Sequence, residues 1–183
     1  AIFYWSEFIL ENERLVELNM KIYIIGAVAS GKTTLAKTLS DRLDVPYYSL
    51  DNVVHLPDAQ SPTGNTKRSV TEQAQLFAHI LQQDRYIIED VGRPQFTKGL
   101  HEVDHILFLD FPVYQLYKRV IFRWLKQGVG IEASNYKPTV AMLSKMLKWA
   151  TTSSKRQIQP FLAKTTILRN KRDNQNYSDQ FEV

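Results

Sequence analysis

The chain has no cysteine among its 183 residues. This absence excludes a disulfide scaffold, a thiol nucleophile and a zinc–thiolate site. It also fits a protein of a reducing cytoplasm, which is the location we expect for this chain. Neither an internal repeat nor a low-complexity tract is present, and the length is that of one domain of ordinary size.

Long charged runs and long apolar runs are also missing. No stretch is apolar enough to span a membrane, and the first residues lack the basic start and the small-residue cleavage site of a signal peptide. The net charge is +4 without a long basic run. This moderate positive field suits an anionic small molecule such as a nucleotide, and it leaves nucleic acid as a less favoured partner.

The first 19 residues differ from the rest of the chain. They contain four glutamates and one arginine, and the pair Met20-Lys21 that follows has the form of an ordinary translation start. An N-terminal helix, an added extension and a gene start placed too early all stay open as explanations. We therefore treat residues 1–19 as an N-terminal extension and residues 20–183 as the functional domain.

Short apolar runs alternate with segments of helical periodicity along the functional domain. We expect strands at the β-branched and aromatic runs and helices where apolar residues recur at the 3.6-residue period. The expected strands are residues 21–25, 46–50, 86–88, 106–109 and 165–168, and the expected helices are 35–43, 69–84, 112–127 and 139–155, with a short polar helix near the C-terminus. This alternation predicts an α/β class, three-layer α/β/α fold with a five-stranded parallel sheet.

Acidic residues follow three of the expected strands. Asp51 comes after the second strand, the pair Glu89-Asp90 after the third and Asp110 after the fourth. Ligands of parallel sheets bind beyond the carboxyl ends of the strands, so these acids are candidates for a site. The segment 52–66 is rich in proline, asparagine, glycine and serine, and we predict that it is a loop.

One motif carries specific chemistry. The segment Gly26–Thr33 reads GAVASGKT and fits the pattern G-x-x-x-x-G-K-[ST] in full, between an expected strand and an expected helix. Glycines let the backbone N–H groups wrap around a phosphate, and the positive end of the helix dipole adds to the attraction. Lys32 then reaches the β- and γ-phosphates, and the Thr33 hydroxyl ligates Mg²⁺. The motif therefore predicts a phosphate-binding loop.

With the loop in place, the order of the later features resembles the adenylate-kinase-like branch of the P-loop NTPases. It most resembles the bacterial topology modulation proteins, which are an adenylate-kinase-related group. The resemblance covers about residues 20–170. Five segments carry it, namely GAVASGKTTLA from Gly26, SLD ending at Asp51, YIIED ending at Asp90 with Arg93 following, DHILFLDFP from Asp104, and the pair Arg119 and Arg123.

The resemblance implies a nucleoside- or nucleotide-kinase type of enzyme that uses ATP and Mg²⁺, with a small lid at about residues 128–138. Only the resemblance favours ATP over GTP, together with the absence of an N-K-x-D guanine-reading motif. It implies a donor-nucleotide site made of Gly26, Ala29, Ser30, Gly31, Lys32, Thr33, Thr34 and Arg119. It implies catalytic roles for Lys32, Arg123, Asp51 and Arg93, and a metal site made of Thr33 and Glu89.

Each of these side chains suits its implied task. The arginine four residues after the strand-end acid, Arg93, matches the one that grips the acceptor in this family, and Arg119 and Arg123 match the pair beside the lid. Arg119 and Arg123 share one helix face, and guanidinium groups bind phosphate oxygens in pairs. Glu89 and Asp90 point to opposite sides of a strand, so we expect only one to face the metal, with Glu89 preferred.

Three functions stay open from the sequence. A small-molecule kinase that phosphorylates a nucleotide or other metabolite is favoured over an ATPase or GTPase switch and over a nucleotide-dependent regulator that binds nucleic acid. We expect a monomer or a homodimer without membrane association. The segment from His101 to His105 also matches H-E-x-x-H, a zinc-protease pattern, but that pattern needs one continuous helix and a strand is expected to begin there.

Overall fold

The structure is a computed structural model, and it describes residues 20–62, 64–131, 138–151 and 158–169. The elements in chain order are β1 (Lys21–Gly26), α2 (Lys32–Leu43), β2 (Tyr47–Ser49), α3 (Leu50–Val54), β3 (His55–Pro57), β4 (Asn65–Lys67), α4 (Val70–Leu81), β5 (Tyr86–Asp90), η2 (Pro94–Phe96), α5 (Thr97–Glu102), β6 (His105–Leu109), α6 (Val113–Gly128), α7 (Val140–Ala150), η3 (Gln159–Lys164) and β7 (Thr165–Leu168).

Five strands form the main sheet, in the order β2-β5-β1-β6-β7. Every neighbouring pair is parallel, which confirms the predicted five-stranded parallel sheet. The central strand β1 pairs with β5 on one side and with β6 on the other, so that Ile25 lies opposite Asp90 and Gly26 opposite Leu109. The carboxyl ends of these three strands therefore meet at one edge, where the loop after Gly26 begins.

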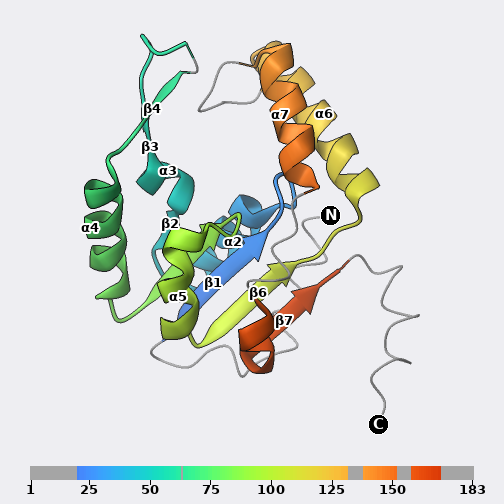
Figure 1. Cartoon of the computed structure of the whole chain (residues 1–183). Helices are drawn as coiled ribbons and strands as arrows, with labels where there is room; N and C mark the ends of the chain where they lie inside the picture. Colours follow the sequence, from blue (N-terminus) through green and yellow to red (C-terminus); the bar gives the residue numbers. More distant parts are fainter. Residues whose placement is uncertain (1–19, 63, 132–137, 152–157, 170–183) are drawn as a thin grey trace.

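Side chains of the strands alternate between two hydrophobic clusters, one on each face of the sheet. Tyr23 and Ile25 belong to the cluster that includes residues of α3, α4 and α5. Ile22 and Ile24 belong to the other cluster, which includes residues of α2, α6 and α7. The chain thus forms the predicted three α/β/α layers. Figure 1 shows the β3–β4 hairpin and the α6–α7 pair rising from the upper end of the sheet, on opposite sides.

The prediction of a loop at residues 52–66 is wrong in part. The segment holds most of the short helix α3 and a small antiparallel hairpin of β3 and β4. Asp58 stabilises the hairpin turn, because its carboxylate accepts hydrogen bonds from Ser61 N and Thr66 Oγ1 at 3.3 and 2.6 Å. The Arg68 guanidinium donates to the Val53 and His55 carbonyls at 3.3 Å each, which satisfies the end of α3.

The helix starts agree with the sequence signals. Ser69 and Glu72 form a capping box at the start of α4, with Glu72 N donating to Ser69 Oγ at 3.2 Å and Ser69 N to Glu72 Oε2 at 2.9 Å. Thr139 caps α7. Residues 1–19, the central part of the expected lid at 132–137, and the expected C-terminal helix lie outside the described residues. Within the described helices, none is long and apolar enough to cross a membrane.

Candidate active site

The loop that joins β1 to α2 is held in a tight conformation. Gly31 and Ala29 have φ angles of 98° and 61°, which is the left-handed region that favours glycine. A side chain at Gly26 would lie 2.9 Å from Leu109 O and 2.9 Å from Ser30 Oγ, so the first glycine is required by close packing. The conformation of the loop therefore depends on both glycines, on Gly26 for close packing and on Gly31 for its left-handed backbone.

Lys32 lies at the start of α2, and its side chain crosses the loop. Its Nζ donates to Ala27 O at 2.8 Å, and the residue is buried. Burial lowers the pKa of Lys32, while the nearby carboxylates of Glu89 and Asp51 oppose that shift. Acids on two other elements thus offset part of the effect of burial on Lys32.

Thr33 and Glu89 place two oxygen atoms together beside the loop. The Thr33 hydroxyl donates to Glu89 Oε1 at 2.8 Å, and Glu89 is buried. A hydroxyl and a carboxylate are hard oxygen ligands of the kind that Mg²⁺ binds together with water and substrate phosphates. Among the described residues no group of three or more metal-ligating side chains exists, so this pair could hold Mg²⁺ only with such additional ligands.

The neighbouring acid, Asp90, has a different environment. Its side chain is fully buried and accepts from Gly92 N at 2.8 Å and from Arg93 N at 2.6 Å. Gly92 has a φ angle of 89°, so Asp90 stabilises a turn that needs glycine. The structure thus separates the two adjacent acids, with Glu89 at the loop threonine and Asp90 in the turn after β5.

Arg93 joins this turn to α3. Its guanidinium forms ion pairs with both Asp90 and Asp51. Burial lowers the pKa of Arg93, but the two carboxylates outweigh burial and raise it. The Asp51 side chain is 58% exposed, whereas that of Arg93 is 19% exposed. A carboxylate and a guanidinium are therefore presented together, with the carboxylate open to solvent.

Arg119 lies on α6, and its side chain contacts the phosphate-loop motif. Its guanidinium donates to Ser30 O at 3.1 Å and lies 4.3 Å from the centre of the Phe111 ring. Partial burial lowers the pKa of Arg119, but an arginine stays charged at physiological pH. Arg123 lies one turn further along α6 and is exposed, and Thr34 is exposed in the first turn of α2.

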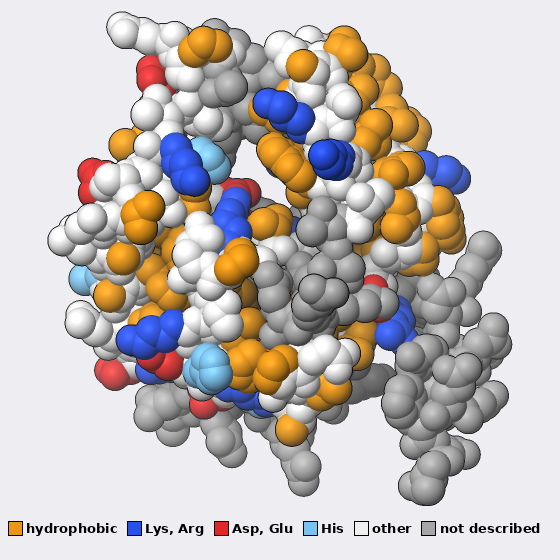
Figure 2. All heavy atoms as spheres, in the orientation of Figure 1, with side chains coloured by type: hydrophobic (Ala, Val, Ile, Leu, Met, Phe, Trp, Pro, Cys, Tyr) orange, Lys and Arg blue, Asp and Glu red, His pale blue; other side chains and the backbone are white. Residues whose placement is uncertain are grey.

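The described part of the site stands between two protruding units. Figure 2 shows a gap between the β3–β4 hairpin and the α6–α7 pair, with charged side chains of both signs at its floor. Two supporting residues were not predicted from the sequence: Phe111, whose ring contacts Arg119, and Arg68, which donates to the end of α3. Nothing in the sequence marks Phe111 as a partner of Arg119 or Arg68 as a donor to the carbonyls at the end of α3.

The two remaining sequence candidates have other surroundings. In the zinc-protease pattern, α5 ends at Glu102 and His105 begins β6, so the two histidines are not on one helix. The expectation that a strand begins within the pattern is confirmed, although His101 and Glu102 end a short helix. Asp110, after β6, accepts from Arg169 Nε at 3.2 Å and so joins the ends of β6 and β7.

Comparison with known proteins identifies the fold. No family model and no curated sequence matches the chain. Solved structures do match it, at low sequence identity. A sugar kinase from Janibacter sp. HTCC2649 has a TM-score of 0.52 at 15% identity over 82% of this chain and 85% of that one. Shikimate kinase from Acinetobacter baumannii, in complex with shikimate, has a TM-score of 0.52 at 16% identity over 91% of this chain and 93% of that one.

A third solved structure agrees with these two. A gluconokinase from Sinorhizobium meliloti 1021 has a TM-score of 0.50 at 13% identity and covers 91% of this chain and 99% of its own. The chain therefore has the fold of small P-loop kinases. At these identities the likeness shows the fold alone, so the more specific resemblance to topology modulation proteins stays a prediction.

Proposed function

We infer that the protein is a kinase that transfers the γ-phosphate of Mg·ATP to a small-molecule acceptor. The observation that carries this proposal is the contact between Thr33 and Glu89, which brings the hydroxyl of the phosphate-loop motif and a buried strand-end carboxylate to one place. The fold, which is shared with small-molecule kinases, supports the same conclusion.

The loop residues would bind the triphosphate. The N–H groups of the Gly26–Thr33 loop and the start of α2 attract phosphate oxygens, and Lys32 neutralises their charge. Thr33 and Glu89 would hold Mg²⁺, which supplies charge neutralisation at the transferred phosphate. Arg119, anchored on Ser30 O and Phe111, would contact the donor nucleotide, with Arg123 a further cation on the same helix face.

The acceptor would bind at Asp51 and Arg93. Phosphoryl transfer depends mainly on positioning and charge neutralisation, and an exposed carboxylate can orient the attacking hydroxyl by accepting its hydrogen bond. Arg93, already fixed by Asp90, can bind an anionic group of the same acceptor. We therefore propose an acceptor that carries both a hydroxyl and an anionic group. Sugar acids and related hydroxy acids meet this description, and nucleotides stay within it.

The experiment is a screen for ADP release with Mg·ATP and a panel of acceptors. The panel should contain gluconate, shikimate, their uncharged analogues, simple sugars and the nucleoside monophosphates, and mass spectrometry should identify a phosphorylated product. The proposal predicts transfer to an acceptor that has both groups. ADP release that does not depend on any acceptor would instead indicate an ATPase and would contradict the proposed kinase activity.

A further inference from the structure

The outer face of α6 carries a row of exposed apolar residues. One face of the helix packs on the core and α7 through Leu116, Val120 and Gln127. A second face exposes Tyr114, Tyr117, Ile121 and Leu125 by 60%, 36%, 43% and 48%. Figure 2 shows hydrophobic side chains gathered along this edge of the molecule. Contiguous apolar surface of this kind marks interaction sites in soluble proteins.

We propose that this row is the contact surface for a second copy of the chain, and that the two α6 helices pack antiparallel with Ile121 at the two-fold axis. The row consists of residues 114, 117, 121, 125 and 128, and its spacing of three, four, four and three is symmetric about Ile121. An isologous interface needs a surface that is complementary to itself when it is reversed. The symmetric spacing gives α6 this property.

Side-chain size agrees with the antiparallel arrangement. In this register Tyr117 lies opposite Leu125 of the second copy, and Tyr114 lies opposite Gly128 of the second copy. Gly128 is exposed, and a side chain built on it would meet nothing within 4 Å. The glycine thus leaves room for an aromatic ring. At each end of the row the aromatic ring of Tyr114 thus meets a glycine of the second copy, which allows close packing of the two helices.

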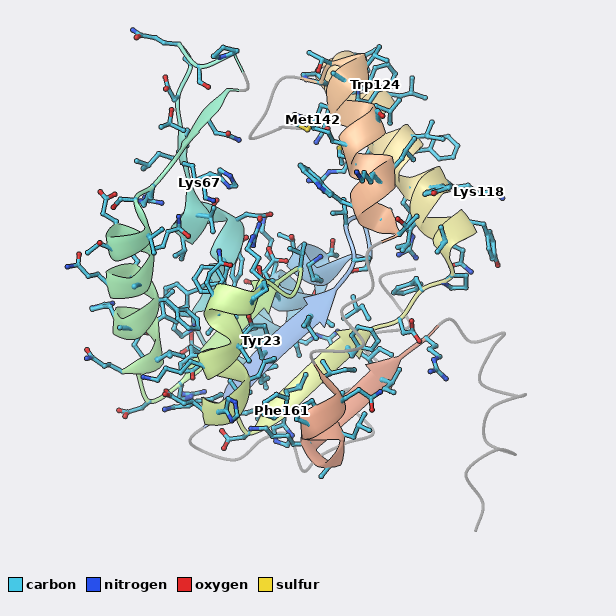
Figure 3. All side chains as sticks on the ribbon, viewed as in Figure 1. Tyr23, Lys67, Lys118, Trp124, Met142 and Phe161 are labelled. Atoms are coloured by element: carbon cyan, nitrogen blue, oxygen red, sulfur yellow. The ribbon has the colours of Figure 1, made fainter. Side chains whose placement is uncertain are left out.

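Charge favours a second copy over an acidic or nucleic-acid partner. Three of the four cations of α6, namely Arg119, Arg123 and Lys126, lie on the side of the helix away from the row, by its 3.6-residue period. Only Lys118 borders the row, and Figure 3 shows it on the side of α6 away from α7. In the antiparallel register Lys118 lies level with position 124 of the second copy. A parallel pair would instead place two Lys118 side chains opposite each other.

The lack of cysteine allows a direct test of the register. Facing helices have axes about 8–10 Å apart, so residues at the two-fold axis come within the Cα separation of a disulfide, about 4.4–6.8 Å. The variant Ile121→Cys contains a single thiol and should form a covalent dimer under mild oxidation. Tyr114→Cys should not, because its opposite position is 128. In a parallel dimer the Ile121→Cys variant and the Tyr114→Cys variant would both cross-link, and that result would overturn the proposal.

Light scattering after gel filtration supplies the second test. The intact chain should elute at about twice the 21.2 kDa of one copy. Ile121→Lys should be a monomer with unchanged circular dichroism. Leu76→Lys, which replaces an equally exposed apolar residue in the middle of α4, should stay a dimer. An intact chain that is monomeric at about 100 μM, or an Ile121→Lys variant that is still dimeric, would contradict the proposed interface. These measurements do not depend on the proposed kinase activity.

Discussion

The Thr33 hydroxyl donates a hydrogen bond to Glu89 Oε1 at 2.8 Å, and this bond joins the first turn of α2 to the end of β5. The two residues are 56 positions apart in the chain. They meet because β5 lies directly beside β1 in the parallel sheet, so that the strand-end acid reaches the loop that leaves β1. A hydroxyl and a buried carboxylate next to a phosphate loop are what an Mg²⁺-dependent phosphotransferase needs.

Removal of the Thr33 hydroxyl should impair catalysis without damage to the fold. We expect Thr33→Val, which keeps the shape of the side chain, to lower kcat by roughly 100-fold or more, since one transition-state contact is worth that much in enzymes. We also expect it to need more Mg²⁺ for half-maximal rate. Rates measured over a range of Mg²⁺ concentrations check both effects. Thr33→Ser keeps the hydroxyl and should stay active. An equal loss of kcat in the two variants would argue against a metal-binding role of the hydroxyl.

Arg93 should act on the acceptor rather than on ATP. Arg93→Lys keeps the charge but replaces the planar fork of donors that pairs with both Asp51 and Asp90 by a compact ammonium group, so we expect the two ion pairs to weaken. We expect the KM for the acceptor to rise by about 10- to 100-fold, the range typical for loss of one partner of a charged pair. The KM for ATP should stay within about twofold. Steady-state kinetics with each substrate varied in turn separate the two effects. A rise in the KM for ATP alone would contradict the assignment of Arg93 to the acceptor.

Tyr86 predicts how stability depends on alkaline pH. Burial, followed by the charges of Glu102 and Asp104, raises its pKa from 10.0 to about 12. The folded chain therefore favours the neutral phenol, and this contribution to stability is complete below about pH 10 and is lost as the pH rises to about 12. Tyr86→Phe cannot ionise and should lose less stability over this interval than the unaltered chain. Urea unfolding at pH 8 and at pH 11 provides the comparison.

The same variant has a predicted effect at neutral pH. The Tyr86 hydroxyl is buried and has no hydrogen-bond partner among the described residues. Its removal should leave the free energy of unfolding unchanged or raise it by up to about 1 kcal/mol. Tyr47 lies on β2, which is the neighbour of β5 in the sheet, and it is half-buried. Tyr47→Phe therefore serves as a control for the loss of a tyrosine hydroxyl. A Tyr86→Phe variant destabilised at pH 8 would show that the hydroxyl is satisfied in solution.

The sequence was enough to predict the sheet and the loop because both depend on local patterns. The run from Ile22 to Ile25 is apolar on both sides, as a buried parallel strand requires, and Gly26–Thr33 is a local motif. The strand order was not predicted, since parallel strands are joined through distant crossovers. For that reason the sequence could not show that Asp90 accepts a hydrogen bond from Gly92 N while Glu89 accepts one from the Thr33 hydroxyl.

The hairpin of β3 and β4 shows where local signals failed. Its sequence contains Pro57, Pro62 and Gly64, which predict a loop when read one residue at a time. The hairpin and α3 are instead stabilised by contacts across the segment, from Asp58 to Thr66 Oγ1 and from Arg68 to the carbonyls at the end of α3. Strands of three residues have no period of their own to read, so such contacts decide the structure.

We propose that the Gly26–Thr33 loop holds the triphosphate of Mg·ATP and that Lys32 neutralises its charge. The most direct measurement compares phosphate transfer by the unaltered chain, by Lys32→Ala and by Lys37→Ala, which removes an exposed lysine of the same helix. We expect transfer to fall by roughly 10³-fold or more in Lys32→Ala, with unchanged circular dichroism and thermal unfolding, and to stay normal in Lys37→Ala. Near-normal transfer by a folded Lys32→Ala variant would contradict the account.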